Sequence, residues 1–236
     1  MRLMSEKRSF NMEQRRADIL RAARMLIVRD GFDALTTRRL AAEAGVTAPT
    51  LYNLIGDKEA IIRKMVAEGV ERVGNRAKTT DNRSPLEMAE DIIEAAIGVI
   101  ADDEDYYRAV VVASDRVVGA FAAAGDGSAS ISNAAQLSIN MMTMACRAAI
   151  ASRLLEGDVS AETLGLQIFV CYRGPFRDWA HNLISIGEFR RRAMRGMYIV
   201  MAADASPEFR KILREKIIAL EPEFTADRAS SASWER

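Results

Sequence analysis

Residues 36–54 are the stretch that most constrains the fold, because they read as two short helices separated by a single glycine. The first helical pattern carries a small apolar face formed by Leu40, Ala41 and Ala44. Gly45 follows, where a helix can end and the backbone can take a positive φ at low steric cost. Thr47 is a suitable N-cap for the second helix, and Pro49 falls in its first turn, where a missing N–H costs nothing. The stretch therefore predicts a helical hairpin with a tight turn.

The second helix of this hairpin is expected to present mostly polar side chains outward, because Leu51 and Leu54 point back at the first helix. The outward positions are Ala48, Thr50, Tyr52 and Asn53. Threonine and asparagine can reach base edges or phosphates, and tyrosine can donate a hydrogen bond to a phosphate. The hairpin is similar to a helix-turn-helix, whose second helix enters the DNA major groove. Taken by itself, it is equally compatible with a plain hairpin inside an all-α domain.

The spacing from Thr36 to Lys58 resembles the DNA-binding signature of the TetR/AcrR family of bacterial transcriptional regulators. The matching residues are Thr36, Arg38, Leu40, Ala41, Ala44, Gly45, Val46, Tyr52, Ile55, Lys58 and Ile61. Ile55 stands where the family usually has phenylalanine, so it supplies packing without an aromatic edge. The resemblance implies an all-α protein with an N-terminal three-helix DNA-binding domain. A larger C-terminal helical domain would bind a ligand and form a dimer.

The same resemblance implies which residues contact a double-stranded DNA operator. Lys58 would lie in the first turn of a helix capped by Asp57, where free backbone N–H groups attract anions such as a DNA phosphate. The expected DNA-contacting residues are Thr36, Thr37, Arg38, Thr47, Ala48, Pro49, Thr50, Tyr52, Asn53 and Lys58. The formal net charge of the chain is zero, but residues 1–29 hold eight Arg or Lys against three Asp or Glu. This local excess favours phosphate contacts near the hairpin.

The helical patterns divide the chain into five segments. Residues 1–11 are expected to form a basic tail, and residues 12–75 the helix-turn-helix domain. Residues 76–84 are polar and turn-prone, which indicates a linker. Residues 85–221 would form the C-terminal domain, and residues 222–236 a C-terminal tail. No stretch shows the alternation of apolar and polar residues that is typical of a strand.

Several helix ends in the C-terminal domain can be predicted. Ser84 to Glu87 and Ser185 to Glu188 each have the pattern of a capping box, with serine at the N-cap and glutamate three residues later. A long helix is expected from about Ala129 to Glu156. Gly174-Pro175 is expected to break or kink the helix that contains it.

The resemblance also implies what the C-terminal domain does. The helices at about 161–203 would form a homodimer, which matches two recognition helices to a palindromic operator. A small, hydrophobic molecule would bind inside the domain and shift the two DNA-binding heads. Aromatic and methionine side chains line apolar pockets, and most of them could equally be core. The candidates are Tyr106, Tyr107, Phe121, Met142, Phe169, Tyr172, Phe176, Trp179 and His181.

Other classes of protein fit the sequence less well. Two cysteines, Cys146 and Cys171, are too few for a disulfide framework, and we interpret them as small buried hydrophobic residues. The sequence also has no apolar run long enough to span a membrane. We therefore expect a cytoplasmic protein. We expect no metal and no cofactor, since the acidic run at 102–105 suits a helix start and His181 is the single histidine. An enzyme is disfavoured, because the chain has no glycine-rich phosphate loop, HExxH motif or CxxC pair.

The sequence therefore predicts a ligand-responsive transcriptional regulator, and the family resemblance makes it a repressor. Two alternatives remain open at this stage. The chain would be an activator of the same family, or a helical interaction protein that has lost DNA binding, for which Ile55 and the neutral net charge leave room.

Overall fold

The computed structural model describes residues 2–77, 83–124 and 129–221, with side chains described for residues 10–77, 83–115 and 135–221. Within these ranges the chain folds into ten α-helices and one short 3-10 helix, and a single antiparallel bridge joins Leu155 to Ala205. The predicted all-α class is confirmed. None of the helices in the described ranges is long and apolar enough to cross a membrane.

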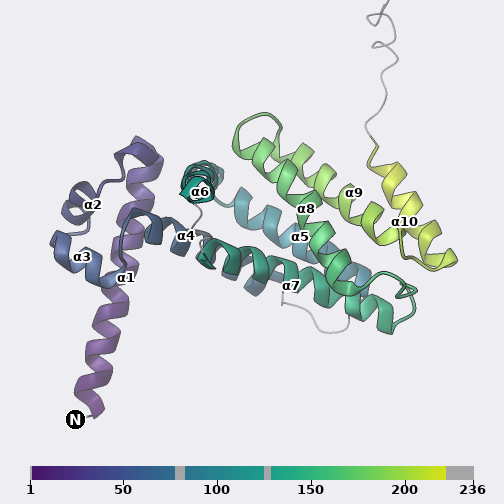
Figure 1. The fold of residues 1–236 in the computed structure, drawn as a ribbon, viewed down its shortest axis with the longest axis horizontal. Helices are drawn as coiled ribbons and strands as arrows, with labels where there is room; N and C mark the ends of the chain where they lie inside the picture. Colours follow the sequence, from purple (N-terminus) through teal and green to yellow (C-terminus); the bar gives the residue numbers. More distant parts are fainter. Residues whose placement is uncertain (1, 78–82, 125–128, 222–236) are drawn as a thin grey trace, which may run out of the picture.

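Figure 1 shows the helices in two groups, with α1 to α3 at one end, α5 and α7 to α10 at the other, and α6 between them near α4. The elements are α1 (Arg2–Asp30), η1 (Phe32–Ala34), α2 (Thr37–Glu43), α3 (Ala48–Leu54), α4 (Lys58–Ala77), α5 (Pro85–Ala101), α6 (Glu104–Ala124), α7 (Ala129–Ala151), α8 (Ala161–Ala180), α9 (Ile186–Ala202) and α10 (Pro207–Ala219). Helix α4 connects the groups, because it packs against α1 on one side and against α5, α6 and α7 on the other.

The N-terminal helices share one apolar core. Helix α1 packs against α2, α3 and α4, and its Ile19 and Leu26 are buried together with Leu40, Leu51 and Ile62. The expected tail at residues 1–11 was wrong for residues 2–11, which belong to α1, because this helix begins at Arg2. Residues 2–11 contain neither glycine nor proline and include several strong helix formers. Nothing in this stretch therefore prevents the helix from beginning near the N-terminus. The helix ends before Gly31, whose φ of 78° reverses the chain.

The aromatic side chains of α8 explain why this helix is continuous. Of the predicted break or kink at Gly174-Pro175, the break does not occur, since α8 runs from Ala161 to Ala180 with Pro175 inside it, and the kink stays a prediction. On one side of the proline, the Tyr172 ring stacks on Phe176 with centroids 5.5 Å apart. Beyond it, Phe176 stacks on Trp179 at 5.9 Å. This aromatic row packs on both sides of the proline and offsets the loss of one backbone hydrogen bond.

The buried carboxylate of Asp204 organises the connection after α7. The prediction that this helix reaches Glu156 was wrong, because it ends at Ala151. Asp204 accepts hydrogen bonds from the N–H groups of Gly157, at 2.9 Å, and Val159, at 3.0 Å. These bonds come from a residue that is distant in sequence, so helical periodicity could not reveal the earlier end.

The predicted helix caps are confirmed in most cases. Ser84 and Glu87 form both halves of a capping box at the start of α5. At the start of α9, Ser185 accepts from the Glu188 N–H, but the predicted reciprocal bond is replaced by ion pairs of Glu188 with Arg191 and Arg192. Hydrogen bonds from Arg192 and Arg191 lower the pKa of the Glu188 carboxyl, so it stays ionised.

The division into domains remains a prediction. Helix α4 runs to Ala77 and α5 begins at Pro85, so the proposed linker at 76–84 lies largely in residues 78–82, outside the described part of the chain. The proposed tail at 222–236 also lies outside it.

The close packing of α7 on α8 provides a test of the fold. A Cβ at Gly165 would lie 2.8 Å from the Thr143 backbone nitrogen and would also collide with the Thr143 hydroxyl. We expect Gly165→Ala to lower the free energy of unfolding by about 1–3 kcal/mol, which is typical of overpacking. Urea unfolding measures this change. Gly174→Ala is the matched control, since a Cβ there meets nothing within 4 Å, and a control that is destabilised equally would contradict the packing argument.

Candidate DNA-contacting surface and interior cavity

Side-chain caps define the starts of α2 and α3, and a glycine forms the turn between these helices. Thr36 caps α2 by accepting from the Arg39 N–H at 3.3 Å, and Thr47 caps α3 by accepting from the Thr50 N–H at 3.3 Å. Between the helices Gly45 has a φ of 63°, the left-handed conformation that glycine adopts at low cost. The predicted helical hairpin is therefore confirmed, with the predicted N-cap and glycine turn.

One face of α3 is open to solvent. Leu51 is completely buried, whereas the side chain of Tyr52 is 65% exposed. Among the other predicted DNA-contacting residues of the hairpin, Thr50 is half-buried. The rest are exposed, namely Thr36, Thr37, Arg38, Thr47, Ala48, Pro49 and Asn53. The structure thus brings these side chains to the surface of one hairpin, and their contact with DNA remains a prediction.

Two cations hold the ends of α3 and α4. Arg16 of α1 donates from Nε to the Leu54 carbonyl at 3.1 Å, which satisfies an orphan acceptor at the C-terminal end of α3. Lys58 begins α4, as predicted, and Asp57 caps this helix by accepting from the Ala60 N–H at 2.7 Å. The Lys58 ammonium also lies 3.7 Å from the centroid of the Phe32 ring, a cation–π contact that the sequence did not indicate.

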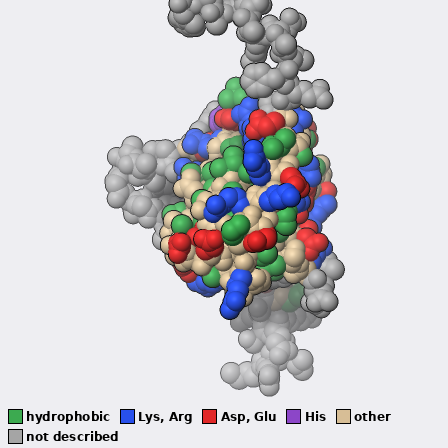
Figure 2. Space-filling model, turned by 90° about the vertical axis from the view of Figure 1, so that its right-hand side faces the viewer, with side chains coloured by type: hydrophobic (Ala, Val, Ile, Leu, Met, Phe, Trp, Pro, Cys, Tyr) green, Lys and Arg blue, Asp and Glu red, His purple; other side chains and the backbone are tan. Residues whose placement is uncertain are grey.

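Carboxylates balance much of the positive charge on α1. Four arginines of this helix form ion pairs: Arg16 with Glu13, Arg21 with Asp18, Arg24 with Asp103, and Arg29 with Asp30. The excess of positive charge near the N-terminus is therefore less available to phosphates than the residue count suggested. Figure 2 shows the opposite end of the molecule, where Lys and Arg side chains lie interspersed with Asp, Glu and apolar residues.

A cavity of about 470 Å³ lies among α4, α5, α6, α7 and α8 and is partly open to solvent; we name it the interior cavity after the helices that surround it. Its lining is mostly apolar and includes five of the predicted ligand-contacting residues, namely Tyr107, Met142, Phe169, Tyr172 and Phe176. The helices α4 and α5 contribute further lining residues that sequence reasoning missed, such as Met65, Val70 and Ile92. Aliphatic residues at helical spacing read as ordinary core, so only the tertiary packing distinguishes those that face a void.

Three other candidates, Tyr106, Trp179 and His181, are not among the described lining residues of this cavity. Tyr106 lies under the Arg24 guanidinium, 4.1 Å from its ring centroid, and burial raises the pKa of its phenol to about 12. Trp179 is buried and donates from Nε1 to Glu104 at 3.2 Å. His181 is exposed, with Nε2 3.4 Å from an Asp115 oxygen. The Phe121 side chain lies outside the described residues.

Among the residues whose side chains are described, the charged ones that line the cavity are Asp115, Arg173 and Arg177. Asp115 accepts from Arg177 Nε at 3.0 Å, which pairs two of these charges with each other. Arg173 is exposed. The apolar lining therefore dominates, and this composition suits a small apolar molecule.

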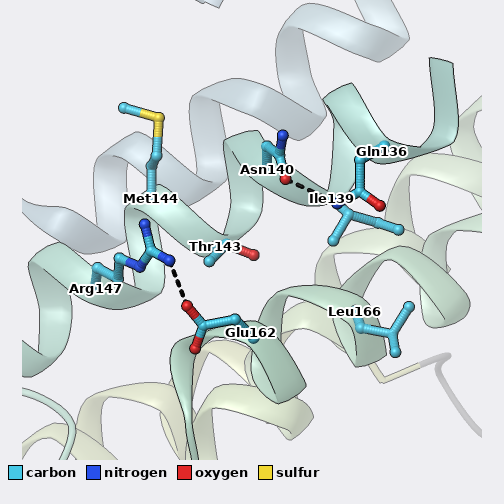
Figure 3. A pocket seen from close by; sticks show the side chains of 8 residues that line it. All are labelled: Gln136, Ile139, Asn140, Thr143, Met144, Arg147, Glu162 and Leu166. Carbon is cyan, nitrogen blue, oxygen red and sulfur yellow. Dashed lines mark hydrogen bonds and ion pairs between the residues drawn. The ribbon is translucent and has the colours of Figure 1, made fainter. Parts of the chain in front are cut away.

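Figure 3 shows a second hollow, a surface groove of about 490 Å³ between α7 and α8. Its polar side chains bond to one another: Arg147 pairs with Glu162, and Gln136 Nε2 donates to Asn140 Oδ1 at 2.9 Å. These pairings leave the groove with fewer free polar groups for a ligand, so we regard the interior cavity as the stronger candidate.

Comparison with known proteins is consistent with this arrangement. Residues 19–65 match the model of the family described as bacterial regulatory proteins, tetR family. The HTH-type transcriptional repressor KstR of Rhodococcus jostii is 32% identical over 81 residues, which are 34% of this chain and 38% of that repressor. This chain thus spans well under half of the repressor's length in the match.

Solved structures share the fold over most of the chain. A TetR-family transcriptional regulator from Syntrophomonas wolfei has a TM-score of 0.64 at 15% identity, covering 80% of this chain and 95% of that one. SmeT, the repressor of the Stenotrophomonas maltophilia multidrug efflux pump SmeDEF, has a TM-score of 0.62 at 15% identity, covering 82% and 92%. The likeness extends well beyond residues 19–65 to the C-terminal helices.

The Thr47 cap gives a prediction for the stability of α3. Thr47→Ala should lower the free energy of unfolding by about 1 kcal/mol, because the Thr50 N–H loses its acceptor. Thr47→Ser should retain most of the stability, since it keeps the hydroxyl. Urea unfolding compares both variants with Thr37→Ala, an exposed position at the start of α2. Equal stability of Thr47→Ala and Thr37→Ala would contradict the cap.

Proposed function

Because this chain is a transcriptional regulator of the tetR family by its N-terminal domain, we propose that it binds a palindromic DNA operator as a homodimer. In this proposal it represses transcription until a small hydrophobic molecule enters the interior cavity. Such a function would be carried out in the cytoplasm of a bacterium.

The exposed face of α3 supports DNA binding more than any other observation. Tyr52 is a large aromatic residue that is 65% exposed on a helix whose other face is buried. A phenol, threonine hydroxyls and the Asn53 amide can all bond to phosphates or base edges. The caps at Thr36 and Thr47 and the Arg16 bond to Leu54 make this face rigid before DNA arrives.

Adjacent tyrosines on α6 support a response to a ligand. Tyr107 lines the cavity, whereas the neighbouring Tyr106 carries the Arg24 guanidinium of α1 on its ring. The two tyrosine rings contact each other edge to face, with centroids 5.0 Å apart. A ligand that displaces Tyr107 would thereby change the contact between α6 and α1. A molecule that favours one arrangement shifts the population toward it.

Exposed apolar side chains on α8 and α9 support a dimer. Val170 is 49% exposed and Ile199 is 54% exposed, and both lie within the predicted interface at 161–203. These helices approach each other closely, because a Cβ at Gly196 would lie 2.9 Å from the Cys171 Cβ. A two-fold axis through this pair would bring two copies of α3 onto both halves of a palindrome.

We propose that the protein represses rather than activates transcription, because the related KstR is named a transcriptional repressor. An activator of the same family, and a helical interaction protein without DNA binding, are the alternatives. A regulator accounts for the matched N-terminal domain, and we propose no enzymatic activity.

DNA binding can be tested by fluorescence anisotropy with fragments that flank the protein's own gene. We expect specific binding that weakens steeply between about 50 and 200 mM salt, because phosphate contacts release counterions. Tyr52→Ala should weaken specific binding about tenfold or more. Asn53→Ala should instead change sequence preference. No salt-sensitive binding to any genomic fragment would contradict the proposal and favour the interaction protein.

A second series isolates the role of Lys58. Lys58→Met removes the charge but keeps apolar contact with Phe32, so the fold should be retained. Each lost phosphate contact lowers the salt slope by about 0.9, so a dimer should lose about 2. Lys211→Ala on α10 is the matched control and should leave the slope unchanged. If Lys58→Met alters sequence preference at an unchanged slope, the phosphate role is wrong.

The dimer can be tested by light scattering coupled to size-exclusion chromatography. Val170→Asp should convert the dimer to a monomer, because it would bury a charge in the proposed interface. Ile212→Asp on α10 is the matched control, since Ile212 is 47% exposed and lies outside the proposed interface. A dimer that survives Val170→Asp but is lost in Ile212→Asp would move the interface to α10.

A further inference from the structure

We propose that the interior cavity binds an uncharged, mostly apolar molecule with an oxygen that accepts a hydrogen bond from the phenol groups of Tyr107 and Tyr172. This inference rests on the proposed function, because it takes the cavity as the effector site. It adds the chemical class of the effector and the side chains that distinguish it from a plain hydrocarbon or a carboxylate.

Tyr107 provides the main observation. Its side chain lines the cavity and is only 7% exposed, and its hydroxyl oxygen is buried without a hydrogen-bond partner. A buried polar group without a partner is costly, because it has lost its bonds to water. The ring packs against the backbone of α4, where a Cβ at Gly69 would lie 3.3 Å from Tyr107 Cε1. A small turn of this ring toward the cavity would give the hydroxyl an acceptor on a bound molecule.

Tyr172 offers a second phenol from α8. It lines the same cavity, and its ring is held between Phe176, at 5.5 Å, and Phe189, at 5.3 Å. The Tyr172 side chain is half-buried. Burial raises the pKa of the Tyr172 phenol, so the group remains protonated and able to donate. Two neutral donors on opposite helices suit a ligand that brings acceptors.

The charges around the cavity argue against an ionised ligand. Arg177 bonds to Asp115, whose carboxylate also lies 3.4 Å from His181 Nε2. Arg173 also lines the cavity, but its side chain is exposed, so water screens its charge. Among the described lining residues of α4 and α6 there is no cation, so a carboxylate placed beside Tyr107 would be buried without a charge partner from them, which is strongly unfavourable. A ketone, ester or alcohol oxygen meets the phenols without this cost.

Isothermal titration calorimetry on the full chain without DNA tests the proposal. The probes are methyl nonyl ketone and undecanoate, which have equal numbers of carbon atoms. We expect the ketone to bind at least about tenfold more tightly than undecanoate. Tyr107→Phe and Tyr172→Phe should each weaken ketone binding about tenfold, the effect of one lost hydrogen bond. Tyr198→Phe removes a phenol of α9 that bonds to Glu90 and is not among the lining residues, so it is the matched control, with unchanged binding.

Thermal unfolding of the unliganded variants provides an independent readout. Tyr107→Phe should melt at or above the temperature of the original protein, because it removes a buried hydroxyl that has no partner. A clearly lower melting temperature would show that the hydroxyl is already bonded, and would overturn the inference. Tighter binding of undecanoate than of the ketone would overturn it as well. So would ketone binding by both phenol variants that is as tight as that of the original protein, or no detectable ketone binding. If the ketone binds as expected but leaves DNA binding unchanged, the proposed effector response fails and the ligand class stands.

Discussion

The contact between Arg24 and the first turn of α6 joins the two ends of this molecule. Arg24 projects from α1, pairs with Asp103 and lies over the Tyr106 ring. Asp103 also accepts from the Tyr106 N–H at 3.3 Å, so one carboxylate holds the arginine and the start of α6 together. An ion pair that is partly exposed contributes little stability by itself. Its importance lies in position, since it ties the helix that braces α3 to the helix that lines the cavity.

Helix α4 provides a second connection between the same two regions. Its first residue, Lys58, packs on Phe32 next to the hairpin, and its middle residues Met65 and Gly69 line the cavity. The start of α6 and the length of α4 therefore lie between the candidate DNA surface and the candidate effector site. A molecule that pushes these two helices apart would act on both connections at once. This arrangement gives the proposed response a physical route through packed side chains, in place of an argument from distance alone.

Local signals in the sequence predicted the hairpin well. Gly45, the Thr47 cap and the Ser84 capping box act through bonds to residues three or four positions away, so their effect is legible in a short window. The errors arose where side-chain interactions compete with local backbone preference, and only in the case of Asp204 is the competing residue distant in sequence. Pro175 lies inside a continuous helix because an aromatic row flanks it, and α7 stops early where Asp204 bonds to the following turn. Glu188 pairs with arginines instead of completing its capping box.

The sequence by itself determined the all-α class, the capped hairpin with its outward polar face, and the aromatic residues from which a cavity could be built. Only the tertiary structure decided that Tyr107 and Tyr172 line a void while Tyr106 and Trp179 pack elsewhere. Only it placed Arg24 against Asp103, 79 residues along the chain. The physical reason is that caps and turns are set by neighbours in sequence. Voids and long-range ion pairs depend instead on how whole helices pack, and helical periodicity shows which face is apolar but not what that face meets.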